Sequence, residues 1–285
     1  MYQAGLVLEG GGMKGLYTAG VLDYFLEKNL FFSHVYGVSA GACHMCSYLS
    51  RQLGRARDVS VDYLEDRFYC SPLSLALTGN LFNVDIAYHL IPDFLYPFDH
   101  EAYHQYTGKA YSVVTNIETG RAEYLRVRDL KRDIDMIRAS ASLPLVSRNV
   151  KIGGKLYLDG GIADPVPIVK SVMDGNRKNV VILTKEEGYV RKPTGSGELA
   201  LIKARYAKYP KIYELMAERH TNYNATIDYL YRQQENGLAY VIRPRFPSKV
   251  GRIEKNREVL LELYRQGYEE AASHYEGLMA YLGKE

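Results

Sequence analysis

Residues 34–41 read His34-Val35-Tyr36-Gly37-Val38-Ser39-Ala40-Gly41. The apolar run 34–38 is typical of a buried strand, and residues 40–53 have the apolar spacing of a helix. The pattern G-x-S-x-G between a strand and a helix is typical of a nucleophile elbow, a tight turn that holds a strained serine toward a substrate. Ser39 is therefore the candidate nucleophile, and Gly37 and Gly41 make the turn. The alternative is a plain connection between a strand and a helix.

A second glycine-rich segment, Gly10-Gly11-Gly12-Met13-Lys14-Gly15, precedes the elbow. It follows a predicted strand at 4–8 and leads into a predicted helix at 15–28. The N–H groups of its consecutive glycines are free to point into a site, which suits an oxyanion hole. Lys14 falls in the first helical turn, where the helix dipole disfavours a cation, so it indicates a purpose beyond helix stability. A solvated lysine beside a loop is the alternative.

The same segment also contains Gly10-x-Gly12-x-x-Gly15, the fingerprint of dinucleotide-binding proteins. Such a site requires an Asp or Glu at the end of the second strand to bind the ribose. Residues 37–41 occupy that position and include no acidic residue. A dinucleotide site is therefore the weaker alternative.

A third motif, Leu158-Asp159-Gly160-Gly161, follows a predicted hairpin. Apolar runs at 150–152 and 156–158 flank Gly153-Gly154, a turn that needs positive φ. An Asp that leaves a strand into a Gly-Gly turn is well placed to face a cleft, although an Asp that caps the next turn is common. Alone the motif is weak, but with the other two it becomes specific.

The remaining pattern predicts the fold class. Further strands are expected at 110–116, 122–127, 180–183 and 239–242, and further helices at 133–141, 198–236 and 254–282. The chain opens as strand, helix, strand, helix, which favours an α/β fold with a mainly parallel sheet. We expect Pro210 to break the helical region 198–236, and Gly267 is a candidate break in the last helix. With no repeat and no clean linker, residues 1–285 are predicted to form a single domain with a helical extension from about residue 198.

Composition excludes several classes of protein. Apolar residues make up 47% of the 285, which excludes a disordered chain. The net charge of +3 argues against a nucleic-acid binder and predicts at most weak electrostatic contact with a membrane surface. The three cysteines do not build a disulfide framework. We also find no signal peptide and no transmembrane segment, so we expect a cytoplasmic protein, with any membrane contact peripheral and transient.

The order of the motifs excludes a conventional α/β-hydrolase. Such an enzyme has several strands before its elbow and then Ser, Asp and His in chain order, whereas Ser39 follows only two predicted strands. His44, His220 and His274 all lie in helical patterns, where a core or surface role is the default. No histidine is therefore a good candidate for a triad.

The three motifs together resemble the patatin-like phospholipase family. Residues 139–144, Ala-Ser-Ala-Ser-Leu-Pro, are similar to the family segment that precedes the catalytic Asp, and Glu9 stands where Asp is more usual. The resemblance covers about residues 5–167, while residues 241–244 and the last helix are similar to the bacterial branch of the family. It implies a three-layer α/β/α fold and a serine acyl hydrolase that works without a histidine, a cofactor or a metal.

The resemblance also assigns roles. Ser39 would attack a lipid ester carbonyl, Asp159 would take its proton, and the N–H groups of residues 10–12 would hold the oxyanion. The residues that would support them are Lys14, Gly37, Gly41, Gly160 and Gly161. Ser140 and Ser142 lie outside any elbow pattern and are not candidates. The rival class is a lipid-binding or regulatory protein that has kept this fold without turnover.

Two segments carry weaker signals. Cys43-His44-Met45-Cys46 contains C-x-x-C, but small buried residues on the elbow helix explain it better than a metal or redox site. The aromatic, proline-broken region 68–98 is expected to line an acyl pocket or touch lipid, or else to be ordinary core.

Overall fold

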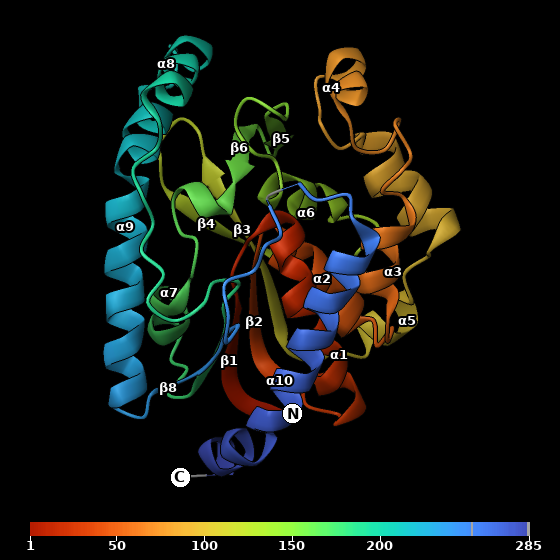
Figure 1. Ribbon diagram of the computed structural model, residues 1–285, viewed down its shortest axis with the longest axis vertical. Coiled ribbons are helices and arrows are strands. Elements are labelled where there is room, and N and C mark those ends of the chain that lie inside the picture. Colours follow the sequence, from red (N-terminus) through yellow and green to blue (C-terminus); the bar gives the residue numbers. More distant parts are fainter. Residues whose placement is uncertain (252, 284–285) are drawn as a thin grey trace.

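The computed structural model describes residues 1–251 and 253–283. They fold into three layers, with an eight-stranded sheet between two layers of helices (Figure 1). The predicted α/β/α class is therefore confirmed.

The sheet is parallel at its centre and on one side. Its strands are β1 Tyr2–Leu8, β2 Phe32–Val38, β3 Lys109–Asn116, β4 Ala122–Val127, β5 Val150–Ile152, β6 Lys155–Asp159, β7 Asn179–Ile182 and β8 Ala239–Ile242. The order is β5-β6-β3-β2-β1-β7-β8, with β4 paired to β3. The five strands from β3 to β8 are parallel, whereas β4, β5 and β6 add antiparallel pairs at the β3 side. The mainly parallel sheet was predicted correctly.

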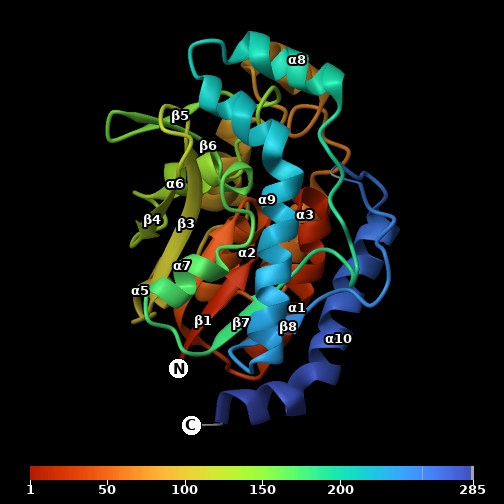
Figure 2. The ribbon, with the colours of Figure 1, turned by 90° about the vertical axis from the view of Figure 1, so that its left-hand side faces the viewer.

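Helices cover both faces of this sheet (Figures 1 and 2). The α-helices are α1 Leu16–Glu27, α2 Ala40–Leu49, α3 Arg55–Asp62, α4 Pro72–Thr78, α5 His100–His104, α6 Ile134–Ser140, α7 Ile168–Met173, α8 Ser196–Arg205, α9 Pro210–Glu235 and α10 Arg257–Gly283. Short 3₁₀ turns η1 Gly12–Gly15 and η3 Gly160–Ile162, and a π-helix η2 Ile86–Leu95, complete the described elements. α1, α2 and α10 lie on one face and α7 and α9 on the other, and the predicted break at Pro210 separates α8 from α9.

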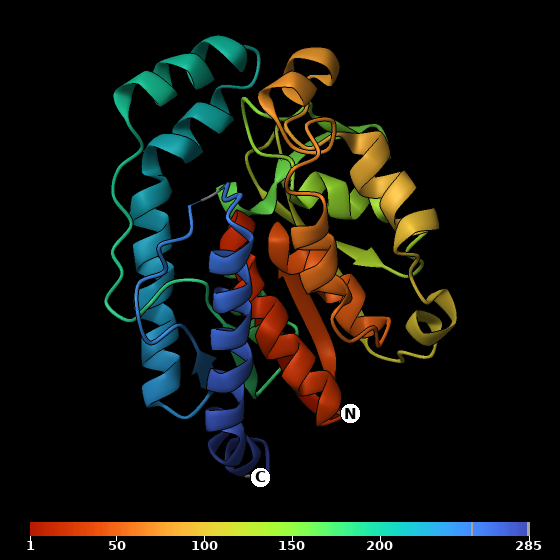
Figure 3. The same ribbon diagram turned by 45° about the vertical axis from the view of Figure 1, so that its right-hand side comes forward.

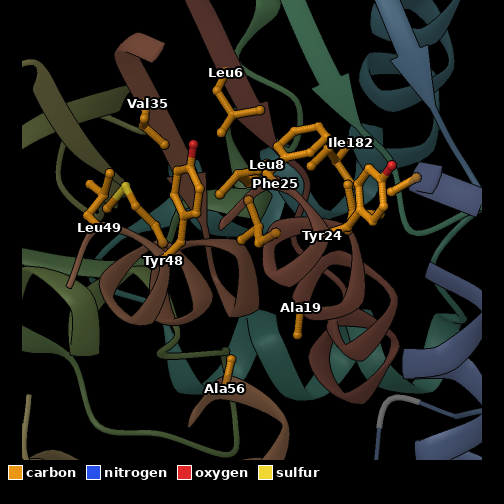
Figure 4. Packing of buried hydrophobic residues seen from close by; sticks show 14 of the residues in the cluster. Leu6, Leu8, Ala19, Tyr24, Phe25, Val35, Tyr48, Leu49, Ala56 and Ile182 are labelled. Atoms are coloured by element: carbon orange, nitrogen blue, oxygen red, sulfur yellow. The ribbon is translucent and has the colours of Figure 1, made fainter. Parts of the chain in front are cut away.

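The side chains of the central strands alternate between the two faces of the sheet, so the hydrophobic core has one part on each face. Leu6 and Leu8 of β1 pack with α1 and α2, as Figure 4 shows, whereas Val7 between them packs with residues of α9. Because successive side chains of a strand point to opposite faces, one strand serves both layers. Such two-sided burial explains why the β1 pattern is a continuous apolar run.

The expected break at Gly267 is absent: α10 is one helix from Arg257 to Gly283. A Cβ on Gly267 would lie 2.1 Å from the carbonyl oxygen of Tyr17, and a Cβ on Gly20 would lie 2.1 Å from that of Tyr264. Gly20 and Gly267 therefore let the backbones of α1 and α10 touch (Figure 3). This close packing, and not a break in the helix, explains why residue 267 is a glycine. The periodicity of a single helix carries no information about such a partner.

One buried carboxyl joins α1, α3 and α10. Asp23 is 3% exposed, and its Oδ2 accepts hydrogen bonds from the Gly54 N–H at 3.0 Å and from the Tyr264 hydroxyl at 2.7 Å. Burial raises the pKa of Asp23 from 3.8 to about 6. Between these values the folded protein holds a proton that the unfolded chain has released. This carboxyl therefore makes the free energy of unfolding fall as the pH rises through that window.

The variant Asp23→Asn is expected to lack this pH dependence. Relative to the wild type, its free energy of unfolding should rise by up to ~3 kcal/mol as the pH increases from about 4 to about 7. Urea titrations at several pH values measure the difference, with Asp228→Asn on the exposed surface of α9 as the matched control. A constant difference across the pH range would show that Asp23 titrates normally.

Candidate active site

Ser39 lies between the end of β2 and the start of α2. Its backbone has φ 54° and ψ −122°, a strained conformation for a residue with a side chain. Its N–H donates to the Ser140 Oγ at 2.8 Å, and its carbonyl accepts from the N–H groups of Ala42 and Cys43. The elbow is therefore held from both sides, and α2 directs its N-terminus at Ser39.

The pairing of β3 brings Asp159 to the same place. β4 pairs along one edge of β3. The other edge is shared by two strands, because the first part of β3 pairs with β2 and its last residues pair with β6. Val38 pairs with Val113, and Asp159 pairs with the next residue, Val114. The carboxyl ends of β2 and β6 consequently meet, which places the serine after Val38 beside Asp159.

Asp159 is 1% exposed and firmly held. Its Oδ1 accepts a hydrogen bond from the Gly161 N–H at 2.7 Å, and its own N–H donates to the Ser142 carbonyl at 2.8 Å. The Gly161 carbonyl accepts from Arg219 Nε at 3.0 Å, which ties this turn to α9. A Cβ on Gly160 would lie 2.1 Å from the Val113 carbonyl oxygen, so only glycine fits there.

The glycine-rich loop completes the arrangement. A Cβ on Gly10 would lie 2.9 Å from the Ser39 Cβ and 3.4 Å from the Val38 side chain, and a Cβ on Gly161 would lie 3.6 Å from that same side chain. The three motifs thus meet around Val38. Within the described residues, the N–H groups of residues 10–12 donate to no protein acceptor. These donors are therefore available to a ligand beside Ser39.

Gly37 and Gly41 allow the elbow to pack tightly. A Cβ on Gly37 would lie 2.5 Å from the Ala42 Cα, and one on Gly41 would lie 2.7 Å from the Leu8 carbonyl oxygen. Both glycines bring α2 close to the sheet, and Gly41 sets the elbow against the end of β1. This packing explains why the motif carries small residues on either side of Ser39.

Glu9 anchors the glycine-rich loop from behind. It is 1% exposed, and its Oε2 accepts from the Thr184 N–H at 2.6 Å and hydroxyl at 3.0 Å. Its Oε1 accepts from the Tyr223 hydroxyl of α9 at 2.9 Å. Glu9 thus joins the ends of β1 and β7 to α9. Sequence reasoning noted Glu9 only as a departure from the usual Asp, and it passed over Ser140, which fixes the elbow.

Positive charge gathers beside the loop. Lys14 lies in η1, two residues after Gly12. Burial lowers the pKa of Lys185, which follows Thr184, to about 8, with Lys14 lowering it further and Glu9 opposing the change. Lys14 and Lys185 therefore place positive charge near the glycine-rich loop, which favours an anion that develops there.

Ser39 opens into a cavity of about 300 Å³. The side chains around it are mostly apolar, and they come from α2, α3, α6 and the region 68–98, including Tyr69, Phe82, Tyr88, Ile91 and Phe98. The π-helix η2 forms one wall. Region 68–98 therefore lines a cavity on its inner side, while six of its large apolar side chains remain exposed: Phe68, Leu73, Leu77, Leu90, Phe94 and Leu95.

None of the three histidines considered above occupies a position like that of Asp159. His44 lines the cavity on α2, and burial lowers its pKa to about 4, so it is neutral at physiological pH. His274 shares a hydrogen bond with the Tyr240 hydroxyl at 3.0 Å on α10, and His220 lies on α9 beside Thr221.

The cysteines of the C-x-x-C pattern are free thiols on α2. Burial raises the pKa of Cys43 to about 12, and the negative charge of Asp159 contributes to this rise. Among the described residues, no group of three or more His, Cys, Asp or Glu is arranged to hold a metal ion.

Comparison with known proteins adds independent information. The model of the family described as "Patatin-like phospholipase" matches residues 6–170, more than half of the chain, and a domain of unknown function, DUF6363, matches residues 209–283. A relative from Escherichia coli (strain K12), "Uncharacterized protein YjjU", is 33% identical over 182 residues, which cover 63% of this chain and 51% of the relative. The chain thus matches about half the length of that relative. A crystal structure of VipD from Legionella pneumophila aligns with a TM-score of 0.48 and 14% identity, covering 97% of this chain and 67% of that chain.

Proposed function

We propose, from the premise that this chain belongs to the patatin-like phospholipase family, that it hydrolyses lipid carboxylic esters through a Ser39–Asp159 dyad. The observation that carries the proposal is the meeting of β2 and β6 along one edge of β3, with Val38 and Asp159 at adjacent positions. The strained backbone of Ser39 and the free N–H groups of the glycine-rich loop support it.

The proposed reaction has two steps. The Ser39 Oγ bonds to the ester carbonyl carbon as its proton passes to the Asp159 carboxylate. The alcohol then leaves with that proton, and the acyl group stays on Ser39. In the second step, water attacks the acyl-enzyme and gives a proton to Asp159, which returns it to Ser39 as the carboxylic acid leaves.

Electrostatic stabilisation must supply much of the rate. A carboxylate with a pKa near ~4 is a weak base for a serine hydroxyl. The N–H groups of residues 10–12 would hold the oxyanion, and the nearby Lys14 and the N-terminus of α2 would stabilise it further. Glu9 acts as a positioning residue, since it fixes the loop without facing the substrate.

The apolar cavity at Ser39 indicates an acyl chain as the group bound there. The test of the proposed function is release of fatty acid from phosphatidylcholine, lysophosphatidylcholine and a triglyceride by the purified protein. We expect release from at least one of them. Binding of these lipids without any release would instead support the rival class, a lipid-binding protein without turnover.

We further propose that region 68–98 touches a lipid surface. The inner side of η2 lines the cavity at Ile91, while Phe94 on its outer side is 75% exposed and Leu77 on nearby α4 is 67% exposed. Exposed apolar side chains that continue from a substrate cavity suit a lipid surface. Among the described residues, no helix combines the length and apolarity needed to cross a membrane. We propose a peripheral contact, made by these exposed side chains.

Charged substitutions on this outer side are expected to weaken vesicle binding. In co-sedimentation with phosphatidylcholine vesicles, the double variant Leu77→Glu, Phe94→Glu should reduce the apparent affinity at least ~10-fold, because it places two charges where apolar surface is buried. Met173→Glu is the matched control, since Met173 is 79% exposed on α7, on the opposite face of the sheet. Equal binding by all three proteins would overturn the proposed surface.

A further inference from the structure

Arg55 is a buried cation at the wall of the Ser39 cavity. It begins α3, is 8% exposed, and lines the cavity together with Ser47 of α2. Burial lowers the pKa of Arg55 only to about 10, so its guanidinium remains charged at neutral pH. The mechanism proposed above gives this charge no role.

The hydrogen bonds of Arg55 go to neutral acceptors. Its Nη1 donates to the Ser47 hydroxyl at 3.0 Å, its Nε and Nη2 donate to the Tyr96 carbonyl, and the Phe98 ring lies 3.6 Å from Cζ. A guanidinium has five N–H donors, so these bonds leave two of them for another acceptor. The ring face and the carbonyl stabilise the cation only in part.

No carboxylate of the described chain offsets this charge. The ionisable groups that act on Arg55 are the thiols of Cys43 and Cys46, and burial raises the pKa of both, so they carry no charge at neutral pH. Glu254 is the one acidic residue among the described cavity-lining residues, and its Oε1 accepts from the N–H groups of Lys255 and Asn256. A buried charge without a counter-charge is strongly unfavourable, and an anion in the cavity would relieve it.

The distance from Ser39 to Arg55 defines what such an anion can be. Ala40, Cys43, His44 and Ser47 follow the helical spacing and line the cavity along one face of α2. At a rise of about 1.5 Å per residue, Ser47 and its partner Arg55 lie about 12 Å along the helix from Ser39. C–C bonds of about 1.5 Å in a staggered chain advance roughly 1.25 Å each, so about nine or ten bonds, close to the length of a ten-carbon chain, span this distance.

We infer that the cavity recognises an acyl group whose far end carries a carboxylate, with the ester carbonyl at Ser39 and the carboxylate at Arg55. This inference rests on the proposed function and names its substrate class: esters of medium-length dicarboxylic acids, cleaved at one end. The two remaining N–H donors of Arg55 supply the charge-assisted hydrogen bonds, and the apolar wall between the two sites contacts the methylene chain.

Three p-nitrophenyl esters of equal acyl length test this inference. They are the decanoate, the hydrogen sebacate, which adds a far carboxylate, and the methyl sebacate, which masks that carboxylate as a neutral ester. We expect the wild type to have a kcat/KM about 10- to 100-fold higher for the hydrogen sebacate than for either neutral ester, the range for hydrogen bonds to a charged group. This comparison needs no variant, so it stands even if Arg55 variants fold poorly.

Two variants then test whether Arg55 causes the preference for the hydrogen sebacate. Arg55→Met should remove it or reverse it in favour of the decanoate, while Arg55→Lys, which keeps the charge without the fork, should retain part of it. A merely structural role of Arg55 would lower all three rates by one factor and leave their ratios unchanged. Equal ratios in wild type and Arg55→Met, or a wild-type preference for the decanoate, would overturn the inference. Hydrolysis of a fourth ester, the short p-nitrophenyl butyrate, tests the proposed function separately. If the protein cleaves none of the four esters, the proposed function itself is wrong.

Discussion

Replacing Ser39 with alanine is expected to abolish hydrolysis of p-nitrophenyl butyrate. The variant lacks the oxygen that forms the acyl-enzyme, so kcat/KM should fall by at least ~10³-fold. The fold should persist, because the elbow is held by the backbone of Ser39 through Ser140 and α2 rather than by its hydroxyl. Circular dichroism and thermal unfolding check the fold beside the rate measurement.

Ser33→Ala is the matched control for this prediction. Ser33 is a buried serine at the opposite end of β2, and its Oγ donates to the Ala4 carbonyl at 3.2 Å. The same chemical change there should leave kcat/KM within a few-fold of the wild type. Full activity in Ser39→Ala would exclude Ser39 as the nucleophile.

The second large effect is expected for Asp159→Asn. The amide keeps the size of the side chain and an oxygen for the Gly161 N–H, but it accepts no proton from Ser39. Activity should therefore fall by ~10² to 10⁴, the range for loss of a general base. Alanine variants of His44, His220 and His274 should retain most activity. The pH–rate profile should also lack a limb near ~6.5, the ordinary pKa of histidine.

Asp164→Asn controls for the loss of a buried carboxyl. Asp164 follows Asp159 by one turn, burial raises its pKa, and its Oδ2 accepts from the Tyr124 hydroxyl at 2.6 Å. We expect this variant to stay folded and active, because the amide keeps an oxygen that can accept from the Tyr124 hydroxyl. A folded Asp159→Asn variant with wild-type activity, together with an inactive histidine variant, would restore a histidine-based mechanism.

The fold class and the order of strands and helices could be predicted because they are local signals. The elbow at residues 37–41, the hairpin around Gly153-Gly154 and the break at Pro210 each depend on a few neighbouring residues. The two-sided burial of the central strands also shows directly in their apolar runs. These features need no knowledge of distant partners.

Other features depend on contacts between distant segments. The adjacency of Val38 and Asp159 follows from the division of one β3 edge between two strands, which no single segment encodes. Ser140 fixes Ser39 across 101 positions of sequence, and Gly267 meets Gly20 of another helix. Arg55 belongs to no sequence motif. Only its burial beside the cavity, which the structure shows, identifies it as a candidate binding residue.

The most direct test of the account is reaction with a fluorophosphonate probe followed by peptide mass spectrometry. The probe's phosphorus bonds to an activated serine, and fluoride leaves. We expect one modified peptide, with the adduct on Ser39, and no labelling of Ser39→Ala. We also expect much slower labelling of Asp159→Asn. An adduct on another serine, or an unlabelled wild type that is otherwise folded, would contradict the account.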